Sequence, residues 1–239
     1  MRQPLVSVII ATRRPGFVAG ILGMMAAQTY RPVELLLVLN LQTPADLPVK
    51  ARDACRDAGA RVVQASPTAT LGECLNVGIA ASRGELLAKV DDDDVYGPEY
   101  LAEAVEALLT GRGDVIGKAE QYVYLAAERE LLVRYPGASG LDGQNDLAGG
   151  TLLFPRALGL DPGFPPLSIA EDTTFLDTCA ARGLRLYATS RRHYVRRRLD
   201  DAHHTWRPED DILKTGSLVA RRQVADDSPA GLIRLVSGR

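Results

Sequence analysis

The first half of the chain alternates apolar runs of strand length with stretches whose apolar residues recur at helical spacing. The strand-length runs lie at residues 5–11, 33–39, 61–63 and 86–90. The helical patterns lie at residues 17–25, 46–58 and 71–82. Most of the runs are almost continuously apolar, which is typical of strands buried on both faces of a parallel sheet. The pattern therefore predicts an α/β fold with a Rossmann-like, mainly parallel central sheet flanked by helices.

The second half has shorter runs and more loop-forming residues, and it predicts a smaller region of strands and loops. We expect strands at 114–118, at two places within 121–135, after a glycine-rich approach at 149–154, and finally at 184–188. The segment 136–145 is rich in Gly, Ser and Asp and predicts a flexible loop. A helix is expected to begin at Glu171-Asp172 and to end at Gly183, and residues 209–224 are expected to be helical before a frayed end.

Four consecutive acids, Asp91 to Asp94, follow the apolar run 86–90, and a helical pattern beginning near Pro98 comes next. The acids are thus expected outside the carboxyl end of a strand, where open α/β sheets bind ligands. Two like charges about 4 Å apart repel by roughly 4 kcal/mol at an effective dielectric of about 20. A hard divalent cation such as Mg²⁺ or Mn²⁺ would offset that repulsion. The alternative is a solvated acidic turn, in which Asp94 caps the following helix.

Composition excludes several classes of protein. The 239 residues carry a formal net charge of -2, so no global field for nucleic acid or membrane is expected. The three cysteines are far apart in sequence, without metal-ligand spacing, and are expected to be buried thiols in a reducing compartment. No apolar run approaches the roughly 20 residues that span a bilayer. The start of the chain lacks a signal-peptide pattern, and we expect a cytoplasmic protein.

Four segments, taken in order, resemble the family 2 glycosyltransferases, which have the GT-A fold. They are the first strand at 6–12, Asn76-Val77-Gly78 with Ser82-Arg83-Gly84-Glu85, the acids Asp91 to Asp94 at the family's D-x-D position, and Glu171-Asp172. The resemblance covers residues from about 5 to 206. It implies a nucleotide-sugar-binding half at 1–113, an acceptor and catalytic half at 114–206, and a C-terminal helix and tail at 207–239, within a single GT-A domain.

The resemblance implies an inverting, metal-dependent enzyme of hexosyltransferase type that moves a sugar from a nucleoside-diphosphate donor to an acceptor hydroxyl. Asp172 is the implied base, with Glu171 next in line. Asp93 and Asp91 are implied ligands of Mn²⁺ or Mg²⁺, and His204, beside His203, is a further candidate ligand. The residues expected at the nucleotide sugar are Ala11, Thr12, Arg14, Asn40, Asn76, Arg83, Asp91 and Asp92. Those expected on the acceptor side are Gly149, Gly150, Thr151 and Trp206.

One departure concerns the nucleobase. The family usually has two aspartates after the second strand, where this chain has Leu39-Asn40. An amide still offers a donor and an acceptor to a base, so the identity of the base stays open.

Two other function classes stay open from the sequence. A sugar nucleotidyltransferase would need a glycine-rich loop after the first strand, and Thr12-Arg13-Arg14-Pro15-Gly16 lacks repeated glycines. The other class is a non-catalytic nucleotide- or sugar-binding module on a decayed transferase fold. Leu39-Asn40 in place of the usual aspartates favours it, whereas the presence of Asp91, Asp93 and Asp172 argues against it.

The acceptor also stays open, as a saccharide, a lipid-linked molecule or another hydroxyl compound. Arg196-Arg197-Arg198 could bind phosphates or an anionic membrane-bound acceptor, or form a solvated strand edge. Whether the chain forms a homodimer is left open, and no nucleic-acid partner is expected.

Overall fold

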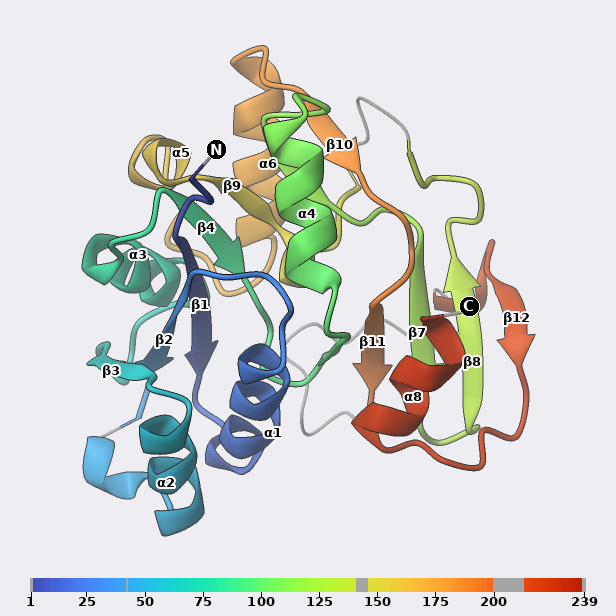
Figure 1. The fold of residues 1–239 in the computed structure, drawn as a ribbon, viewed down its shortest axis with the longest axis horizontal. Coiled ribbons are helices and arrows are strands. Elements are labelled where there is room, and N and C mark those ends of the chain that lie inside the picture. The colour runs from blue at the N-terminus through green and yellow to red at the C-terminus, as the bar shows by residue number, and fades with distance from the viewer. Residues whose placement is uncertain (1, 42, 141–145, 200–212, 238–239) are drawn as a thin grey trace.

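The computed structural model describes residues 2–41, 43–140, 146–199 and 213–237, and its centre is a seven-stranded sheet (Figure 1). The strand order is β10-β6-β9-β4-β1-β2-β3, in which β9 runs antiparallel to both neighbours and the other pairs are parallel. The strands are β1 (Val6–Thr12), β2 (Val33–Leu39), β3 (Arg61–Gln64), β4 (Leu86–Lys89), β6 (Val115–Gly117), β9 (Leu153–Pro155) and β10 (Leu186–Ala188). The expected α/β fold with a mainly parallel sheet is confirmed.

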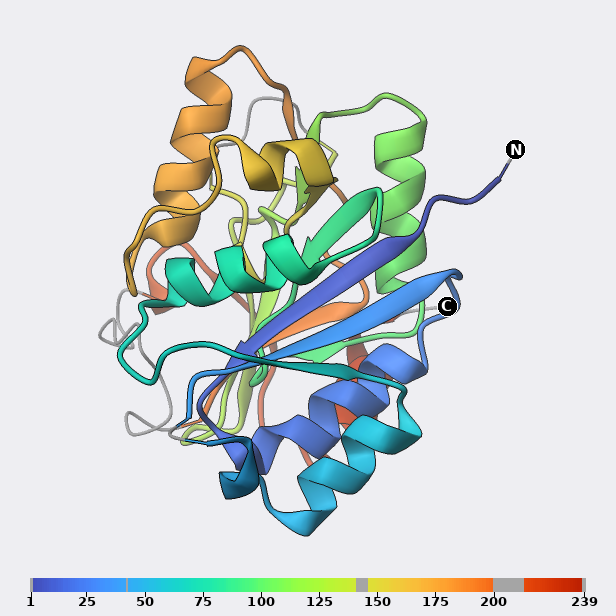
Figure 2. The same ribbon diagram turned by 90° about the vertical axis from the view of Figure 1, so that its left-hand side faces the viewer.

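Helices cover both faces of this sheet, as Figures 1 and 2 show from two sides. One core layer lies under α1 (Pro15–Ala26), α2 (Val49–Asp57) and α4 (Tyr100–Leu109). The other lies under α3 (Leu71–Ala81), α5 (Arg156–Leu160) and α6 (Glu171–Ala181). Alternation along β1 supplies both layers, because Val8 and Ile10 pack into the first and Ile9 into the second.

A five-stranded sheet, of order β12-β8-β7-β11-β5, stands beside the central sheet (Figure 1). Its strands are β5 (Val95–Tyr96), β7 (Gln121–Leu125), β8 (Glu130–Arg134), β11 (Tyr194–Arg198) and β12 (Leu218–Arg221). Helix α8 (Pro229–Val236) packs against one of its faces. The hairpin of β7 and β8 is as expected, but the sequence did not predict that a second sheet would form around it.

Several expected boundaries are wrong. The strand at β10 is not the last, since β11 and β12 follow it. Residues 218–221 form β12 rather than helix, and the expected frayed end contains α8. Helix α4 begins at Tyr100 rather than near Pro98, because β5 occupies the segment directly after the acids. Helix α5 was not expected.

The three cysteines, Cys55, Cys74 and Cys179, are buried free thiols, as expected. Within the described parts of the chain, no helix has both the length and the apolar character needed to cross a membrane.

Candidate active site

A cavity of about 650 Å³ opens at the carboxyl ends of the central parallel strands. The segment after β1, the acids after β4 and the start of α6 line part of it. Residues of β7, β8 and β11 line another part, so both sheets contribute to the cavity. This position is the one expected for a ligand site in an open α/β sheet.

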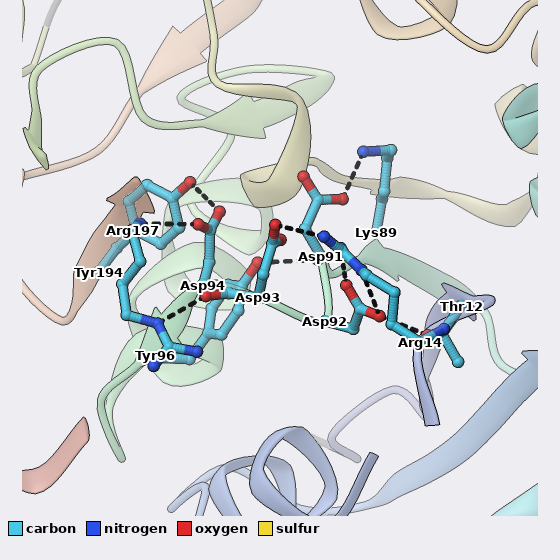
Figure 3. A network of polar contacts seen from close by, with 10 residues as sticks. All are labelled: Thr12, Arg14, Lys89, Asp91, Asp92, Asp93, Asp94, Tyr96, Tyr194 and Arg197. Carbon is cyan, nitrogen blue, oxygen red and sulfur yellow. Dashed lines mark hydrogen bonds and ion pairs between the residues drawn. The ribbon is translucent and has the colours of Figure 1, made fainter. Parts of the chain in front are cut away.

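The acids after β4 are buried rather than solvated. Asp92, Asp93 and Asp94 are 2%, 8% and 4% exposed, which contradicts the solvated-turn alternative. Asp92 accepts hydrogen bonds from the hydroxyl of Thr12 and from the guanidinium of Arg14 (Figure 3). Arg14 also bonds Asp93 Oδ2 at 2.8 Å. The segment after β1 thus binds directly to the acids after β4.

Asp94 connects the acid segment to the second sheet. Its Oδ2 accepts a hydrogen bond from the Tyr194 hydroxyl at 2.6 Å, and its Oδ1 accepts one from Arg197 N at 3.0 Å. The Arg197 side chain donates to the Asp93 carbonyl at 2.6 Å (Figure 3). The alternative that Asp94 caps the following helix is wrong, because Glu99 occupies the N-cap of α4.

Crowding of these carboxylates changes their acidity. Burial raises the pKa of Asp92 to about 6, although Arg14 opposes the rise. Burial and the nearby charges of Asp93 and Asp91 raise the pKa of Asp94 to about 7. Desolvation is therefore the main reason that Asp92 and Asp94 hold their protons more tightly than a solvated aspartate does.

Lys89, at the end of β4, lies between acids from two parts of the chain. It is 3% exposed, and its Nζ lies 2.8 Å from Asp91 Oδ1 and 3.8 Å from Glu171 Oε1. Burial alone would lower the pKa of this ammonium, but the acids around it raise the pKa above its usual value. Sequence reasoning missed Lys89, although a lysine within a buried apolar strand already requires an acidic partner.

Helix α6 brings Glu171 and Asp172 to the cavity at its first turn. Glu171 is 4% exposed, and burial raises its pKa to about 7 while Lys89 opposes the rise. Asp172 is half-buried, and its Oδ1 accepts the Thr173 N–H at 2.7 Å. The two neighbouring acids therefore have different environments, one closed in by Lys89 and the other facing the cavity.

Two glycines let the backbone pass close to the acids. A Cβ on Gly149 would lie 1.7 Å from Asp172 Oδ2, and one on Gly150 would lie 2.7 Å from Asp91 Oδ2. The Gly150 carbonyl accepts the Tyr96 hydroxyl at 2.7 Å, and the same hydroxyl oxygen accepts Asp91 N–H at 2.9 Å. These contacts fix Asp91 relative to the segment before β9.

Of the expected acceptor-side residues, only Gly149 lines the cavity within the described chain. Gly150 does not line the cavity, and Thr151 is buried, with its hydroxyl accepting the Lys118 N–H and donating to the Ala148 carbonyl. The expected contact between Thr151 and the acceptor is therefore corrected: the Thr151 side chain instead links the backbone of Lys118 to that of Ala148. Trp206, His203 and His204 lie outside the described residues, as does 141–145 of the expected loop.

The expected donor residues divide into two groups. Ala11, Thr12, Arg14, Asn40, Asp91 and Asp92 line the cavity. Asn76 does not line the cavity, because its side-chain amide binds the backbone of Phe164. Asn76 Nδ2 donates to the Phe164 carbonyl at 2.8 Å, and Asn76 Oδ1 accepts the Phe164 N–H at 3.0 Å. Arg83 also does not, because it precedes β4 and its Nε binds Glu34 Oε2 at 3.1 Å. Both assignments to the nucleotide are corrected, since these side chains hold the fold together instead.

The cavity also has lining residues from the second sheet, of which sequence reasoning singled out only the three arginines of β11. Gln121 and Arg134 reach it from β7 and β8, together with Arg196, Arg197 and Arg198 of β11. The alternative of a solvated strand edge for these three arginines is wrong, because they line the cavity and are only partly exposed. No local pattern marks Gln121 or Arg134, because only the strand register brings them together.

Comparisons with known proteins identify the family and the fold. The family model described as Glycosyl transferase family 2 matches residues 7–146. The O-antigen biosynthesis protein RfbC of Myxococcus xanthus is 29% identical over 146 residues, which are 60% of this chain but only 10% of that protein.

Solved GT-A structures share the fold. S. aureus TarS 1-349, in complex with UDP-GlcNAc, has a TM-score of 0.65 at 21% identity, over 86% of this chain and 62% of that one. The mannosyltransferase PcManGT of Pyrobaculum calidifontis, with GDP-Man and Mn²⁺, has a TM-score of 0.62 at 17% identity, over 81% and 57%. Glucosyl-3-phosphoglycerate synthase of Mycobacterium tuberculosis, with Mn²⁺ and UDP, has a TM-score of 0.58 at 18% identity, over 98% and 80%.

Proposed function

The chain belongs to glycosyl transferase family 2, and we propose that it transfers a sugar from a nucleoside-diphosphate donor to an acceptor hydroxyl with inversion. One observation carries the proposal. Asp91 and Asp93 after β4 and Asp172 at the start of α6 line the same cavity. Those positions supply the two functions that such a transfer needs, a site for the leaving diphosphate and a base for the acceptor.

The donor's nucleotide is assigned to the part of the cavity near β1 and β2. Arg14 is positioned there by Asp92 and Asp93, and Asn40 stands where β2 ends, with its amide donating to the Ser66 carbonyl. The solved relatives named above hold UDP-GlcNAc, GDP-Man or UDP, which supports a nucleoside-diphosphate sugar as the class of donor.

The acids fit a divalent cation. Among the described residues, no group of three or more His, Cys, Asp or Glu side chains is arranged to hold a metal ion. Mg²⁺, however, is commonly held by one or two carboxylates together with substrate phosphates, and its ligands are oxygens. Asp93 and Asp91 supply such oxygens in the cavity, and Mn²⁺ accepts the same donors. When bound, the cation would neutralise charge that develops on the leaving diphosphate.

The remaining chemistry is assigned to the chain's own acids. Asp172 takes the proton of the acceptor hydroxyl, whose oxygen then attacks the anomeric carbon. The bond from that carbon to the diphosphate oxygen breaks, and its electron pair leaves with the diphosphate. Because this is a single displacement, the product has the opposite anomeric configuration. Lys89 keeps Asp91 and Glu171 in place beside the reacting groups.

The relative RfbC acts in O-antigen biosynthesis, which supports a place for this chain in bacterial glycan or glycoconjugate synthesis. The non-catalytic module is less well supported, because the cavity retains both the paired acids and a separate acid at α6. The cavity contains Gly149 near α6 but no glycine-rich loop after β1, which disfavours a nucleotidyltransferase.

Thermal stability measured with a panel of nucleoside diphosphates, with and without Mn²⁺, tests the donor site. A ligand at 100 times its Kd stabilises the protein by about 2.7 kcal/mol, so the matching base should stand out. Asp93→Ala should remove the Mn²⁺-dependent part of this stabilisation while the unliganded protein stays folded. Unchanged Mn²⁺-dependent binding in that variant, or a transfer product that retains the donor's anomeric configuration, would contradict the proposal.

A further inference from the structure

The 3₁₀ turn Gly149–Thr151, which we call the glycine turn, is in contact with acids from two parts of the cavity. A Cβ on Gly149 would overlap the Asp172 carboxylate, with Asp172 Cγ at 2.6 Å and Asp172 Cβ at 2.9 Å. A Cβ on Gly150 would lie 2.7 Å from Asp91 Oδ2 and 3.0 Å from Asp91 Cγ. Consecutive Cα atoms are about 3.8 Å apart, so the two carboxylates lie against neighbouring residues of one turn.

The backbone conformation of the turn does not require either glycine. Gly137 and Gly140 have positive φ angles, which favour glycine, but Gly149 and Gly150 do not. Their positions exclude a side chain because atoms of the two acids occupy the places where the Cβ atoms would stand. The need for glycine therefore comes from the acids and not from the conformation of the turn itself.

The glycine turn is held at both ends and in its middle. Before it, the Ala148 N–H donates to the Lys118 carbonyl at 2.8 Å, and after it the Leu152 carbonyl accepts the Lys89 N–H at 2.9 Å. The carbonyl of its middle residue accepts a tyrosine hydroxyl from β5 at 2.7 Å. All three residues of the turn are buried. An added methyl group would therefore displace an acid side chain rather than the turn.

Lys89 attracts the same two acid segments toward each other. Its ammonium lies 2.8 Å from Asp91 Oδ1, as Figure 3 shows, and 3.8 Å from Glu171 Oε1, in the residue directly before Asp172. Attraction between opposite charges has no preferred stopping distance other than van der Waals contact. The backbone of the glycine turn supplies that contact for both segments, so it limits how each acid can stand.

We propose that the glycine turn sets the position of Asp172 relative to Asp91, and that Gly149 and Gly150 are positioning residues for sugar transfer. The inference rests on the proposed transferase function, because that function makes Asp172 the base and Asp91 an acid of the donor side. A single displacement needs the base at a fixed place relative to the donor, and a misplacement of about 1 Å can cost about 10²-fold in rate. Gly149 acts through Asp172, and Gly150 acts through Asp91.

Water and azide, used as alternative acceptors, separate a misplaced base from a damaged fold. The donors are UDP-GlcNAc and GDP-mannose with Mn²⁺, and the measurement is release of UDP or GDP by the full chain. Attack by water requires that its proton pass to Asp172, whereas azide is already an anion and needs no base. In both reactions the bond from the anomeric carbon to the diphosphate oxygen breaks, and its electron pair leaves with the diphosphate. Water gives the free sugar, and azide gives the glycosyl azide.

The two glycines should give different kinetic effects. Gly149→Ala should lower kcat with water about 10²-fold, while the rate with azide and the KM of the donor stay unchanged. Asp172→Asn should give the same pattern. Gly150→Ala should instead weaken the Mn²⁺-dependent binding of UDP or GDP about tenfold and raise the KM of the donor. Its ratio of azide to water rates should stay unchanged, a split that a general loss of packing would not produce.

Two other glycines serve as matched controls. A Cβ on Gly159 would meet the side chains of Leu87 and Ile79, so Gly159→Ala crowds the core without touching an acid. Gly20 has no atom within 4 Å of the place of its Cβ, so Gly20→Ala adds a methyl group in open space. Both variants should keep the azide to water ratio of the unaltered chain, although Gly159→Ala should lower the Tm.

Urea unfolding tests the same contact without any activity, and it also covers variants that fold poorly. The destabilisation by Gly149→Ala should be largely relieved in an Asp172→Ala background, because that change removes the overlapping carboxylate. Gly159→Ala should destabilise the protein equally in both backgrounds, since it has no contact with Asp172.

Two results would overturn the inference. One is a Gly149→Ala variant that releases nucleotide with water at the unaltered rate. The other is a Gly149→Ala variant that is destabilised equally with and without the Asp172 carboxylate. Failure of the proposed function would look different, because neither UDP nor GDP would then stabilise the unaltered protein with Mn²⁺, while the coupling between Gly149 and Asp172 in urea would persist.

Discussion

Buried carboxylates lie at both ends of the central strands, in surroundings that differ. We call Glu34 with its donors Ser7, Arg83 and Gly84 the amino-end cluster, and Asp91 to Asp94 the carboxyl-end cluster. At the amino end, the single carboxylate of Glu34 accepts the Ser7 hydroxyl at 2.5 Å, Arg83 N–H at 2.6 Å and Gly84 N–H at 3.1 Å. At the carboxyl end, the donors from Thr12, Arg14, Lys89, Tyr194 and Arg197 are divided among four successive aspartates. Both clusters are largely buried, so the ratio of donors to acids distinguishes them.

The balance between burial, hydrogen bonds and nearby charges decides the direction of each pKa. Burial would raise the pKa of Glu34, but the hydrogen bonds from Ser7 and Arg83 outweigh it and hold the pKa below its usual value. At the other end, burial and mutual repulsion raise the pKa of Asp92 to about 6 and that of Asp94 to about 7. The hydrogen bonds to Glu34 therefore stabilise its charged form and with it the fold, whereas burial disfavours the charged forms of Asp92 and Asp94.

The largest expected effect is at Asp172, which lines the same cavity as the carboxyl-end cluster. Asp172→Asn should lower the rate of sugar transfer by about 10²–10⁴-fold, the usual contribution of a general base, with donor binding and Tm unchanged. Asp177→Asn, an exposed acid on the same helix, is the control and should transfer at the unaltered rate. A near-normal rate in Asp172→Asn, measured with a radiolabelled donor, would pass the role of base to Glu171.

A second change tests whether Lys89 stabilises the folded protein by offsetting the charges of Asp91 and Glu171. Lys89→Met should destabilise the protein by about 3 kcal/mol in urea unfolding, because it leaves Glu171 and Asp91 without their shared cation. Adding Glu171→Gln should recover part of the loss, since the two changes are coupled. The exposed Lys50→Met in α2 is the matched control. If Lys89→Met matched that control, Lys89 would have no structural role between the acids.

A change in the amino-end cluster should lower the stability of the protein and leave ligand binding unchanged. Glu34→Gln should cost about 1–3 kcal/mol of unfolding free energy, because the amide cannot accept all the donors that the carboxylate satisfies. Nucleotide and Mn²⁺ binding should be unaffected, because Glu34 lies at the opposite end of the strands. Glu106→Gln, an exposed position on α4, serves as the control. Weakened nucleotide binding in Glu34→Gln would show that the two ends are not independent.

The smallest effect concerns pH. A carboxyl whose folded pKa is depressed stabilises the fold above its unfolded pKa, and that stability is lost as the pH falls through the folded value. The difference in unfolding free energy between the unaltered protein and Glu34→Gln should therefore be constant near pH 7. It should begin to shrink below the unfolded glutamate value of about 4.3. A difference that persists unchanged at the lowest pH at which both proteins fold would mean that Glu34 contributes through packing rather than charge.

The two ends also differ in how far the sequence predicted them. The run Asp91 to Asp94 is a candidate site from the sequence because it follows a buried strand and lies where the resembling family has its D-x-D motif, although the run alone also fits a solvated turn. Glu34 was not singled out, and Arg83 was assigned to the nucleotide, because an arginine beside a family motif has no local feature that reveals its partner. Its position before β4, at the other end of the strand from the acids, makes it part of the amino-end cluster.

The sequence by itself determined the α/β class, the alternation of strands and helices along the first half, and the acids that line the cavity. These features follow from local periodicity and from charges adjacent in the chain, which need no knowledge of distant contacts. Only the tertiary structure decided that β5, β7, β8, β11 and β12 form a second sheet, and that Gln121 and Arg134 face the same cavity as Asp172. Such pairings depend on strand register between segments far apart in sequence, where the free energy comes from burial and hydrogen bonding that no short segment encodes.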